Sequence, residues 1–337
     1  MVEKNIYISY LRVIATIFVV LIHASTGFLN HFDSYSFNWN YANWINAATR
    51  CAVPLFVALS GALLLSKEEN TLIFYKKRFP KILYPFAFWT LIYLIYYFYR
   101  YTNFTALPIS QVLNIARDKV LHGANAHLWY VYMIVGLYFT IPFLKKIIQL
   151  ASMREIEIFL VLWFLSMFVN YKIFYDYVPK IDLTFFSGYV GYLVLGYYLS
   201  KKTISLPRSI PYIAYFLVIL FTGYITWYLS AKIHKLDPIY YNYNFFNTAL
   251  ATAFLFLALK ITCADKHTMP KWVTLIDQYS FSIYLIHILP LNYIHPWISK
   301  YMDTVYVIPV ATVLSIAASM IIAYIIRLIP GGKYISG

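Results

Sequence analysis

Apolar residues fall along the chain in runs that are long enough to cross a lipid bilayer. A helix rises about 1.5 Å per residue, so about 20 residues span a hydrocarbon core of about 30 Å. Ten such segments are predicted: 8–29, 44–65, 79–100, 127–144, 155–171, 186–200, 210–230, 244–262, 279–298 and 304–328. The pattern predicts an all-α, polytopic membrane protein with about ten transmembrane helices. The chain shows no obvious internal repeat, heptad run or low-complexity linker, so we expect residues 1–337 to form a single integral membrane domain.

The first apolar run, Tyr7–Leu29, carries polar residues on one side. Arg12 and His23 are eleven residues apart, which at about 100° per residue comes within about 20° of three full turns. Both side chains therefore lie on the same helical stripe, about 16 Å apart along its axis, with Ser9 and Thr16 near it. Ionisable groups at membrane depth are costly unless they face a protein interior or a watery cavity. We expect this stripe to line an active site.

Composition and charge agree with a membrane protein. Apolar residues make up 61% of the chain and charged residues 12%, and the mean hydropathy is +0.64. The net charge of +14 comes from Lys and Arg in short connections, and about twice as many lie on one side of the predicted helices as on the other. This bias predicts cytoplasmic N- and C-termini in a cell membrane and gives no evidence for nucleic acid. The two cysteines, Cys51 and Cys263, suggest neither a disulfide framework nor a metal site.

Arg50 is predicted to lie near His23. The second span runs inward from about Trp44, so Arg50 lies about two turns below the outer surface, as His23 does on its own helix. If these spans pack as a hairpin, a fixed positive charge keeps the imidazole neutral, as a general base requires. Two other interpretations stay open: Arg50 snorkels to the outer interface, and His23 is a packed, hydrogen-bonded membrane histidine.

A basic cluster precedes the third span on the predicted cytoplasmic side, and Arg12 enters the membrane about one turn from that side. The cluster consists of Lys76, Lys77, Arg78 and Lys81. Such a cluster commonly sets orientation or contacts anionic lipid. It also suits the phosphates of a nucleotide cofactor that approaches from the cytoplasm.

Aromatic and polar residues gather at the predicted outer end of the fourth span. His127, Trp129 and Tyr130 open this span, and Asp182 precedes the sixth on the same side. Rings stack on the apolar faces of sugars while polar groups bind the hydroxyls, so this set suits a glycan. Interfacial anchoring is the alternative for the aromatic residues. His287, about two turns above the cytoplasmic surface, either lines the cavity or is satisfied by neighbouring helices.

Several stretches together resemble the acyltransferase-3 family of integral membrane O-acyltransferases. These are LRVIATIFVVLIHAS, NWINAATRCAVPLFVALSGALLL, HLWYVYMIVGLY and YSFSIYLIH, and the pattern of spans covers essentially the whole chain. The first two are fairly specific in combination. The chain is most similar to the branch that O-acetylates surface glycans.

The resemblance implies transfer of an acyl group, with acetyl expected, from cytoplasmic acyl-CoA to a hydroxyl of a surface or lipid-linked glycan. It assigns catalysis to His23 and donor or active-site roles to Arg12 and Arg50. The family's basic pair before the third span is commonly two arginines, where this chain has Arg78 and Lys81. A lysine keeps the charge but loses the planar fork, so no bidentate phosphate contact is expected at position 81.

A second departure from the family concerns the residue three positions before Arg12. Many members have aspartate there and this chain has Ser9, so we expect no ion pair at that site. Two other functions remain open: a transporter or flippase of a lipid-linked glycan or polysaccharide, and a sensor or scaffold with a degenerate site. Transporters often show internal repeats and helices broken at the midplane, and the sequence predicts neither.

Overall fold

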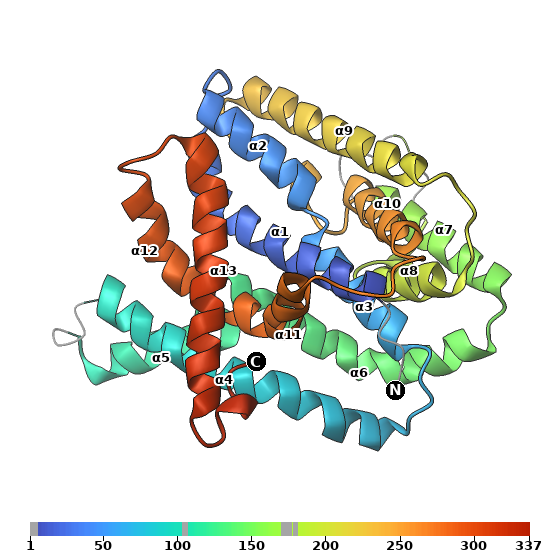
Figure 1. Ribbon diagram of the computed structural model, residues 1–337, viewed down its shortest axis with the longest axis horizontal. Coiled ribbons are helices and arrows are strands. Elements are labelled where there is room, and N and C mark those ends of the chain that lie inside the picture. The colour runs from blue at the N-terminus through green and yellow to red at the C-terminus, as the bar shows by residue number, and fades with distance from the viewer. Residues whose placement is uncertain (1–5, 103–106, 170–176, 178–180) are drawn as a thin grey trace.

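The computed structural model describes residues 6–102, 107–169, 177 and 181–337. These residues form helices joined by turns and loops, and the described chain contains no strand (Figure 1). The all-α prediction is confirmed. The helices are α1 (Ile6–Asn30), α2 (Phe37–Thr49), α3 (Ala52–Leu64), α4 (Thr71–Tyr101), α5 (Ile109–His122), α6 (Trp129–Leu150), α7 (Met153–Val169), α8 (Val190–Lys201), α9 (Ser209–Ile233), α10 (Phe246–Thr262), α11 (Lys271–Ile286), α12 (Ile288–Ile298) and α13 (Thr304–Leu328). Short 3-10 turns are η2 (Ala126–Leu128), η4 (Thr184–Phe186), η5 (Ile239–Tyr241) and η6 (Gly332–Tyr334).

Seven segments of the described chain are long and apolar enough to cross a membrane, and each matches a predicted segment. They are Ile6–Asn30, Phe37–Leu64, Thr71–Tyr101, Ala126–Leu150, Ser209–Ile233, Ile239–Thr262 and Thr304–Leu328. Of the other predicted segments, 155–171 holds the 17-residue α7, 186–200 holds the 12-residue α8, and 279–298 is interrupted at His287. Residues 170 and 171 lie outside the described residues. The chain is a multi-pass membrane protein, while ten spans, cytoplasmic termini and a single domain stay predictions.

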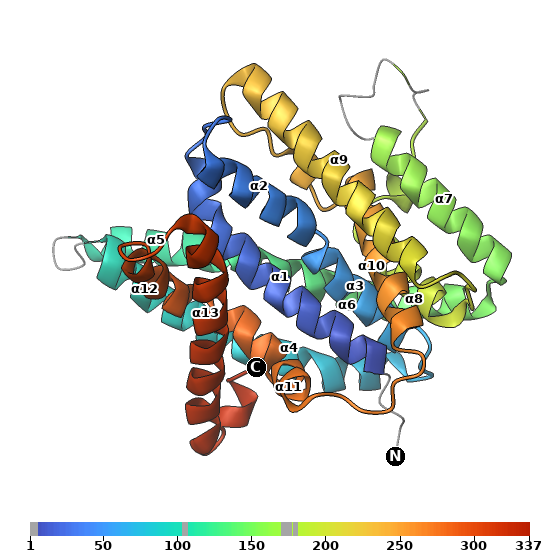
Figure 2. The same ribbon diagram turned by 45° about the horizontal axis from the view of Figure 1, so that its top comes forward.

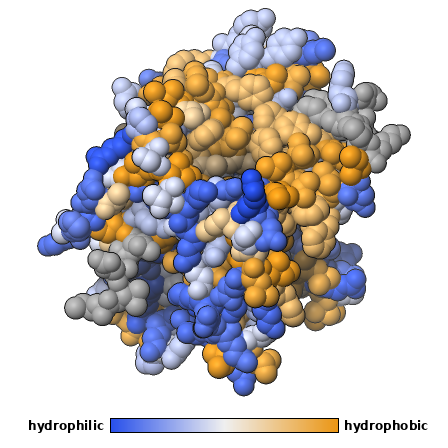
Figure 3. All heavy atoms as spheres, turned by 90° about the vertical axis from the view of Figure 1, so that its right-hand side faces the viewer, coloured by the Kyte–Doolittle hydropathy of each residue, from blue (hydrophilic) through white to orange (hydrophobic). Residues whose placement is uncertain are grey.

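Large apolar side chains cover much of the molecular surface. On α6, one stripe of Phe139, Phe143, Ile147 and Leu150 is exposed, with Leu150 exposed to 90%. Figure 3 shows a broad apolar surface on the upper part of one face and hydrophilic residues gathered lower on it. Soluble monomers rarely expose contiguous apolar patches of more than a few hundred Å². This surface is suited to contact with lipid.

Helix α1 lies inside the bundle. It contacts α2, α3, α10, α11, α12 and α13, and Figure 2 shows it passing between α2 and α11. Leu11, Ala15, Val20 and Ala24 on α1 are fully buried, and the small alanines let neighbouring helices approach closely. The helix that carries the predicted polar stripe is therefore surrounded by protein on several sides.

Two helical segments are broken inside the bundle. Arg50 and Cys51 separate α2 from α3, and His287 separates α11 from α12. A proline lacks an N–H group, and its ring clashes with the carbonyl four residues earlier. Pro54 and Pro290 act in this way on the carbonyls at the two breaks. The expectation of unbroken helices is therefore wrong, and both breaks present polar side chains to the interior.

Helices α3 and α8 pack with their backbones in contact. A Cβ atom at Gly61 would lie 1.9 Å from the carbonyl oxygen of Leu193, and one at Gly196 would lie 1.8 Å from that of Ala58. Only glycine permits this approach, which is typical of helix packing in lipid. Gly196, in the short apolar segment 186–200, thus allows α8 to pack directly on the backbone of α3. The contact fixes α3, which continues from the break at Arg50.

Candidate active site

Three imidazole rings from distant parts of the sequence lie close together, one on α1 and two on elements next to it. His23 lies on α1, His127 in η2 and His287 at the break between α11 and α12. The ring centres are 5.1 Å apart for His23 and His287, 5.2 Å for His127 and His287, and 6.2 Å for His23 and His127. His127 and His287 are buried, whereas His23 stays partly exposed. His23 is therefore the most exposed member of this histidine cluster.

Backbone carbonyls hold the two buried rings. Nδ1 of His287 lies 2.8 Å from the carbonyl oxygen of Tyr284 and 3.1 Å from that of the preceding residue. Because a carbonyl only accepts hydrogen bonds, Nδ1 carries the proton. Nε2 of His287 is buried and has no hydrogen-bond partner among the described residues. His127 lies with Nε2 3.4 Å from the carbonyl oxygen of Leu285 and Nδ1 3.0 Å from the amide oxygen of Asn125.

Arg50 points into the bundle, close to the histidine cluster. Its Nη2 atom donates to the side-chain oxygen of Asn46 at 2.7 Å, and its guanidinium carbon lies 4.5 Å from the ring centre of Tyr241. Nε of Arg50 is buried without a hydrogen-bond partner among the described residues. The guanidinium group is near enough to interact electrostatically with His23. The guanidinium group is thus directed toward Asn46 and Tyr241, within electrostatic range of His23.

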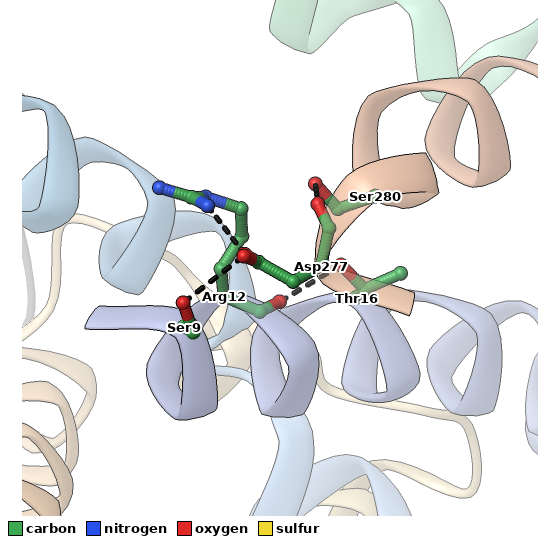
Figure 4. Close-up of polar contacts among 5 residues, drawn as sticks. All are labelled: Ser9, Arg12, Thr16, Asp277 and Ser280. Carbon is green, nitrogen blue, oxygen red and sulfur yellow. Dashed lines mark hydrogen bonds and ion pairs between the residues drawn. The ribbon is translucent and has the colours of Figure 1, made fainter. Parts of the chain in front are cut away.

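The other end of the polar stripe forms an ion pair with α11 (Figure 4). Arg12 donates to the Asp277 carboxylate, and the Ser9 hydroxyl donates to its second oxygen at 3.0 Å. The Thr16 hydroxyl donates to the backbone carbonyl of Arg12 at 2.8 Å. The Asp277 side chain is 3% exposed and that of Arg12 is 27% exposed. The pair holds Arg12 at a position where part of its guanidinium group stays accessible.

A cavity of about 180 Å³ lies beside Arg12. Its walls are formed by Arg12, Phe56, Tyr130, Ser280, Phe281 and Tyr284. The Tyr284 ring also lies 5.5 Å from the ring of His127 and 6.3 Å from that of His287, measured between centres. Tyr284 is therefore a wall shared by the Arg12 cavity and the histidine cluster.

Arg78 of α4 and Arg12 of α1 both lie within electrostatic range of one tyrosine of α6. The Tyr138 hydroxyl is near enough to interact with both guanidinium groups and with the Ser60 hydroxyl. Nε of Arg78 is buried and has no hydrogen-bond partner among the described residues. Two predicted donor-site arginines, 66 positions apart in the sequence, thus face a common region.

A glutamate neutralises part of the basic cluster. Glu69 accepts a hydrogen bond from Nζ of Lys77 at 2.9 Å, and its other carboxylate oxygen lies 3.6 Å from Nη2 of Arg78. The hydrogen bond from Lys77 lowers the pKa of Glu69 below its ordinary value. Lys77 and Lys81 lie one turn apart on α4 and are both exposed. The cluster is accessible, with Arg78 its most enclosed member.

A partly exposed imidazole, partly buried arginines and a cavity beside Arg12 thus occur together in a bundle of apolar helices. The family model described as "Acyltransferase domain" matches residues 5–326. The chain belongs to the acyltransferase-3 family. Comparisons with curated proteins and with solved structures found no significant match. The protein is a membrane acyltransferase whose donor and acceptor must be argued from its residues.

The predicted acceptor residues of this acyltransferase are distributed over different environments. Trp129 stacks on Tyr243, with ring centres 5.5 Å apart and planes at 26°. His127 and Tyr130 are buried, and the ring of Tyr284 packs against both residues. Their place at the outer end of the span stays a prediction. Tyr130 lines the Arg12 cavity.

Asp182 is separate from this group in the acyltransferase. It is exposed, and its carboxylate accepts a hydrogen bond from the backbone N–H of Thr184 at 2.9 Å within its own turn. Among the described residues, the structure shows no contact between Asp182 and the histidine cluster. Its predicted role as an acceptor ligand stays a prediction.

Asp277 is the residue of this acyltransferase that sequence reasoning missed. The expectation that the Arg12 site has no ion pair is wrong, because the carboxylate comes from α11 instead of position 9. The predicted ninth span began at residue 279, so Asp277 was placed outside it, whereas α11 begins at Lys271. An isolated carboxylate ten residues before His287, at the edge of an apolar run, was the available signal.

Proposed function

We propose that this acyltransferase moves an acetyl group from cytoplasmic acetyl-CoA to a hydroxyl of a cell-surface or lipid-linked glycan at the outer face of the cell membrane. The observation that carries the proposal is the position of His23. It is the partly exposed imidazole of an otherwise buried cluster, with Arg50 beside it and the Arg12 cavity beyond Tyr284. A base, a cation and an anion-binding residue are the groups that acyl transfer from a charged donor requires.

The donor phosphates are proposed to bind Arg12 and Arg78, with Lys77 and Lys81 adding positive charge at the exposed surface of α4. Arginine forks suit phosphate oxygens, and the unpartnered Nε of Arg78 supports a ligand at this position. Lys81 contributes a point charge without bidentate geometry. The bias of Lys and Arg along the chain supports a cytoplasmic location for this end of α1.

In the proposed reaction, a nitrogen of His23 accepts the proton of the glycan hydroxyl while the hydroxyl oxygen attacks the thioester carbonyl carbon. The guanidinium group of Arg50 stabilises the oxyanion, and a single donor of this kind contributes about 10² to 10³ in rate. The carbonyl re-forms, the carbon–sulfur bond breaks, and the CoA thiolate takes the proton from His23. The products are the glycan ester and CoA thiol.

The acceptor side is proposed to use aromatic surface. Trp129 and Tyr243 form a stacked pair, and such rings suit the apolar faces of a sugar. His127 and His287 are proposed to line the reaction centre from behind, and Tyr130 the donor cavity. The proposed glycan approaches His23 from the outer end of α1.

The proposal is tested by incubating purified protein in nanodiscs with acetyl-CoA and measuring CoA release with and without surface polysaccharide extracted from the source cells. We expect glycan-dependent release by the wild type and a loss of at least about 10²-fold in His23→Ala. His31→Ala is the matched control, because His31 follows α1 directly, is exposed and bonds only the Gly27 carbonyl. A transporter, flippase or scaffold would release no CoA, and equal rates in both variants would refute the role of His23.

A further inference from the structure

His287 has an unusual hydrogen-bonding state for a residue that is completely buried. Its Nδ1–H group is shared between two backbone carbonyl oxygens at 2.8 and 3.1 Å, and its own carbonyl accepts from the Ser315 hydroxyl at 3.3 Å. These bonds fix both the ring and its tautomer, which leaves a lone pair on Nε2. That nitrogen is buried with no hydrogen-bond partner among the described residues. Buried polar atoms are rarely left unpaired, so this atom has a partner in another state of the site.

Two rings of the cluster, those of His23 and His127, lie near His287, and they differ in whether an N–H group is available to bond its Nε2 atom. A neutral His127 carries one N–H, and each of its ring nitrogens lies within 3.4 Å of an oxygen that can accept it, so this N–H is already used. His23 makes ring contacts but no hydrogen bond with the described residues. Its ring centre lies 5.1 Å from that of His287, a separation at which nitrogens on facing edges reach hydrogen-bonding distance. Of these two rings, His23 is thus the one able to supply an N–H to Nε2.

We propose that His287 is a positioning residue for His23: Nε2 of His287 accepts a hydrogen bond from one ring N–H of His23. This bond fixes the tautomer of His23, so its other nitrogen is unprotonated and available to the acceptor hydroxyl. The inference rests on the proposed function and adds to it a second imidazole. In the transfer step, the hydroxyl proton goes to the free nitrogen of His23 while the first N–H stays hydrogen-bonded to His287. The CoA thiolate then receives the proton from His23.

The arrangement performs the orienting task that a carboxylate performs in serine-hydrolase triads, but with a neutral partner. A carboxylate at this depth would need its own cation, as Asp277 has in Arg12. A neutral imidazole whose Nδ1–H is bonded to carbonyls avoids that requirement. Pro290 has no N–H to bond the Ile286 carbonyl, which lies at the break beside the buried His287 ring.

The test compares His287→Asn with His295→Asn in the full-length protein in nanodiscs. The asparagine amide keeps a donor near the position of Nδ1 and removes Nε2. His295 on α12 is the matched control, because its Nε2 is also buried without a partner but its ring packs on Phe28, 5.4 Å between centres. Two readouts are taken: kcat and KM with acetyl-CoA and extracted surface polysaccharide, and ¹⁵N NMR of histidine-labelled protein, which reports ring tautomers.

For His287→Asn we expect kcat to fall at least about tenfold while KM for acetyl-CoA changes less than about twofold. The His23 ring signals should change from one tautomer to a mixture. His295→Asn should alter neither readout. A wild-type kcat, or a His23 tautomer unaffected by His287→Asn, would overturn the inference.

The two proposals fail in different ways. If the wild type releases no CoA, the proposed function is wrong, while the tautomer measurement still decides whether His287 holds His23. If His287→Asn is not monodisperse in size-exclusion chromatography, His287→Leu is measured instead. Its side chain fills the buried site without any hydrogen-bond acceptor, so wild-type kcat and tautomer in that variant would equally refute the inference.

Discussion

Replacing Asp277 by asparagine removes the negative charge that holds Arg12 inside the bundle. The carboxylate accepts from Arg12 and from the Ser9 hydroxyl, and its side chain is only 3% exposed. Asparagine preserves the shape of the side chain and leaves the guanidinium charge without its partner. The variant therefore isolates the charge interaction between α1 and α11.

The size of the effect follows from the exposure of the two partners. Removing one member of a fully buried ion pair costs about 3–5 kcal/mol. Arg12 keeps 27% of its side chain exposed, and solvent screens part of its charge. We expect a loss of about 2–3 kcal/mol in the free energy of unfolding. Asp265→Asn is the control, because its ion pair with Arg208 is exposed, at 77% and 61%, and is worth about 0–1 kcal/mol.

The assay is equilibrium unfolding in mixed micelles, followed by circular dichroism. In Asp277→Asn, the further change Ser9→Asp returns a carboxylate one turn before Arg12, where the Ser9 hydroxyl already reaches the pair. We expect it to restore at least about half of the lost free energy. The reasoning is refuted if Asp277→Asn costs no more than Asp265→Asn, or if Ser9→Asp restores nothing.

Three further predictions concern helix packing, the donor site and the reaction centre. Gly61→Ala should lower the free energy of unfolding by about 1–3 kcal/mol in the same assay, because the new methyl group would lie 1.9 Å from a backbone oxygen of α8. Gly27→Ala is the control, because its methyl group meets no atom within 4 Å and should not destabilise the protein. Glu69→Gln should lower KM for acetyl-CoA in CoA-release assays by freeing the basic cluster, and Glu68→Gln, on an exposed neighbour, should not. The hydrogen bond from Lys77 holds the pKa of Glu69 below 4.5, so its ion pair persists at neutral pH and is lost only as the pH falls below that value. The difference in KM between Glu69→Gln and Glu68→Gln should therefore be constant from pH 6 to about 8. Arg50→Lys keeps the positive charge but loses the planar guanidinium group, so kcat should fall by about 10-fold or more with little change in KM. A wild-type kcat in this variant would show that Arg50 does not stabilise the oxyanion.

Helical periodicity allowed the polar stripe of α1 to be predicted, because the relation between Arg12 and His23 depends only on local geometry. The helix breaks were not predictable in the same way. Pro54 and Pro290 accompany breaks, whereas Pro142 lies inside continuous α6. Which prolines interrupt a helix depends on whether surrounding elements satisfy the freed backbone groups, and that is a property of the packing.

The site was predictable residue by residue but not as an arrangement. His127 was predicted at the outer end of a span and His287 at membrane depth, and their meeting with His23 depends on how η2 and α11 pack beside α1. The ion pair of Arg12 with Asp277 joins residues 265 positions apart. Contacts of this range are set by tertiary packing, and no single-sequence pattern encodes them.

The central claim is that His23 serves a reaction whose substrates arrive from opposite sides of the membrane. The most direct test uses proteoliposomes with radiolabelled acetyl-CoA on the side of the Arg78 cluster and extracted surface polysaccharide on the other. Wild-type protein should transfer label to the polysaccharide, and His23→Ala should not, although it stays folded and inserted. Label transfer by His23→Ala at the wild-type rate would contradict the account.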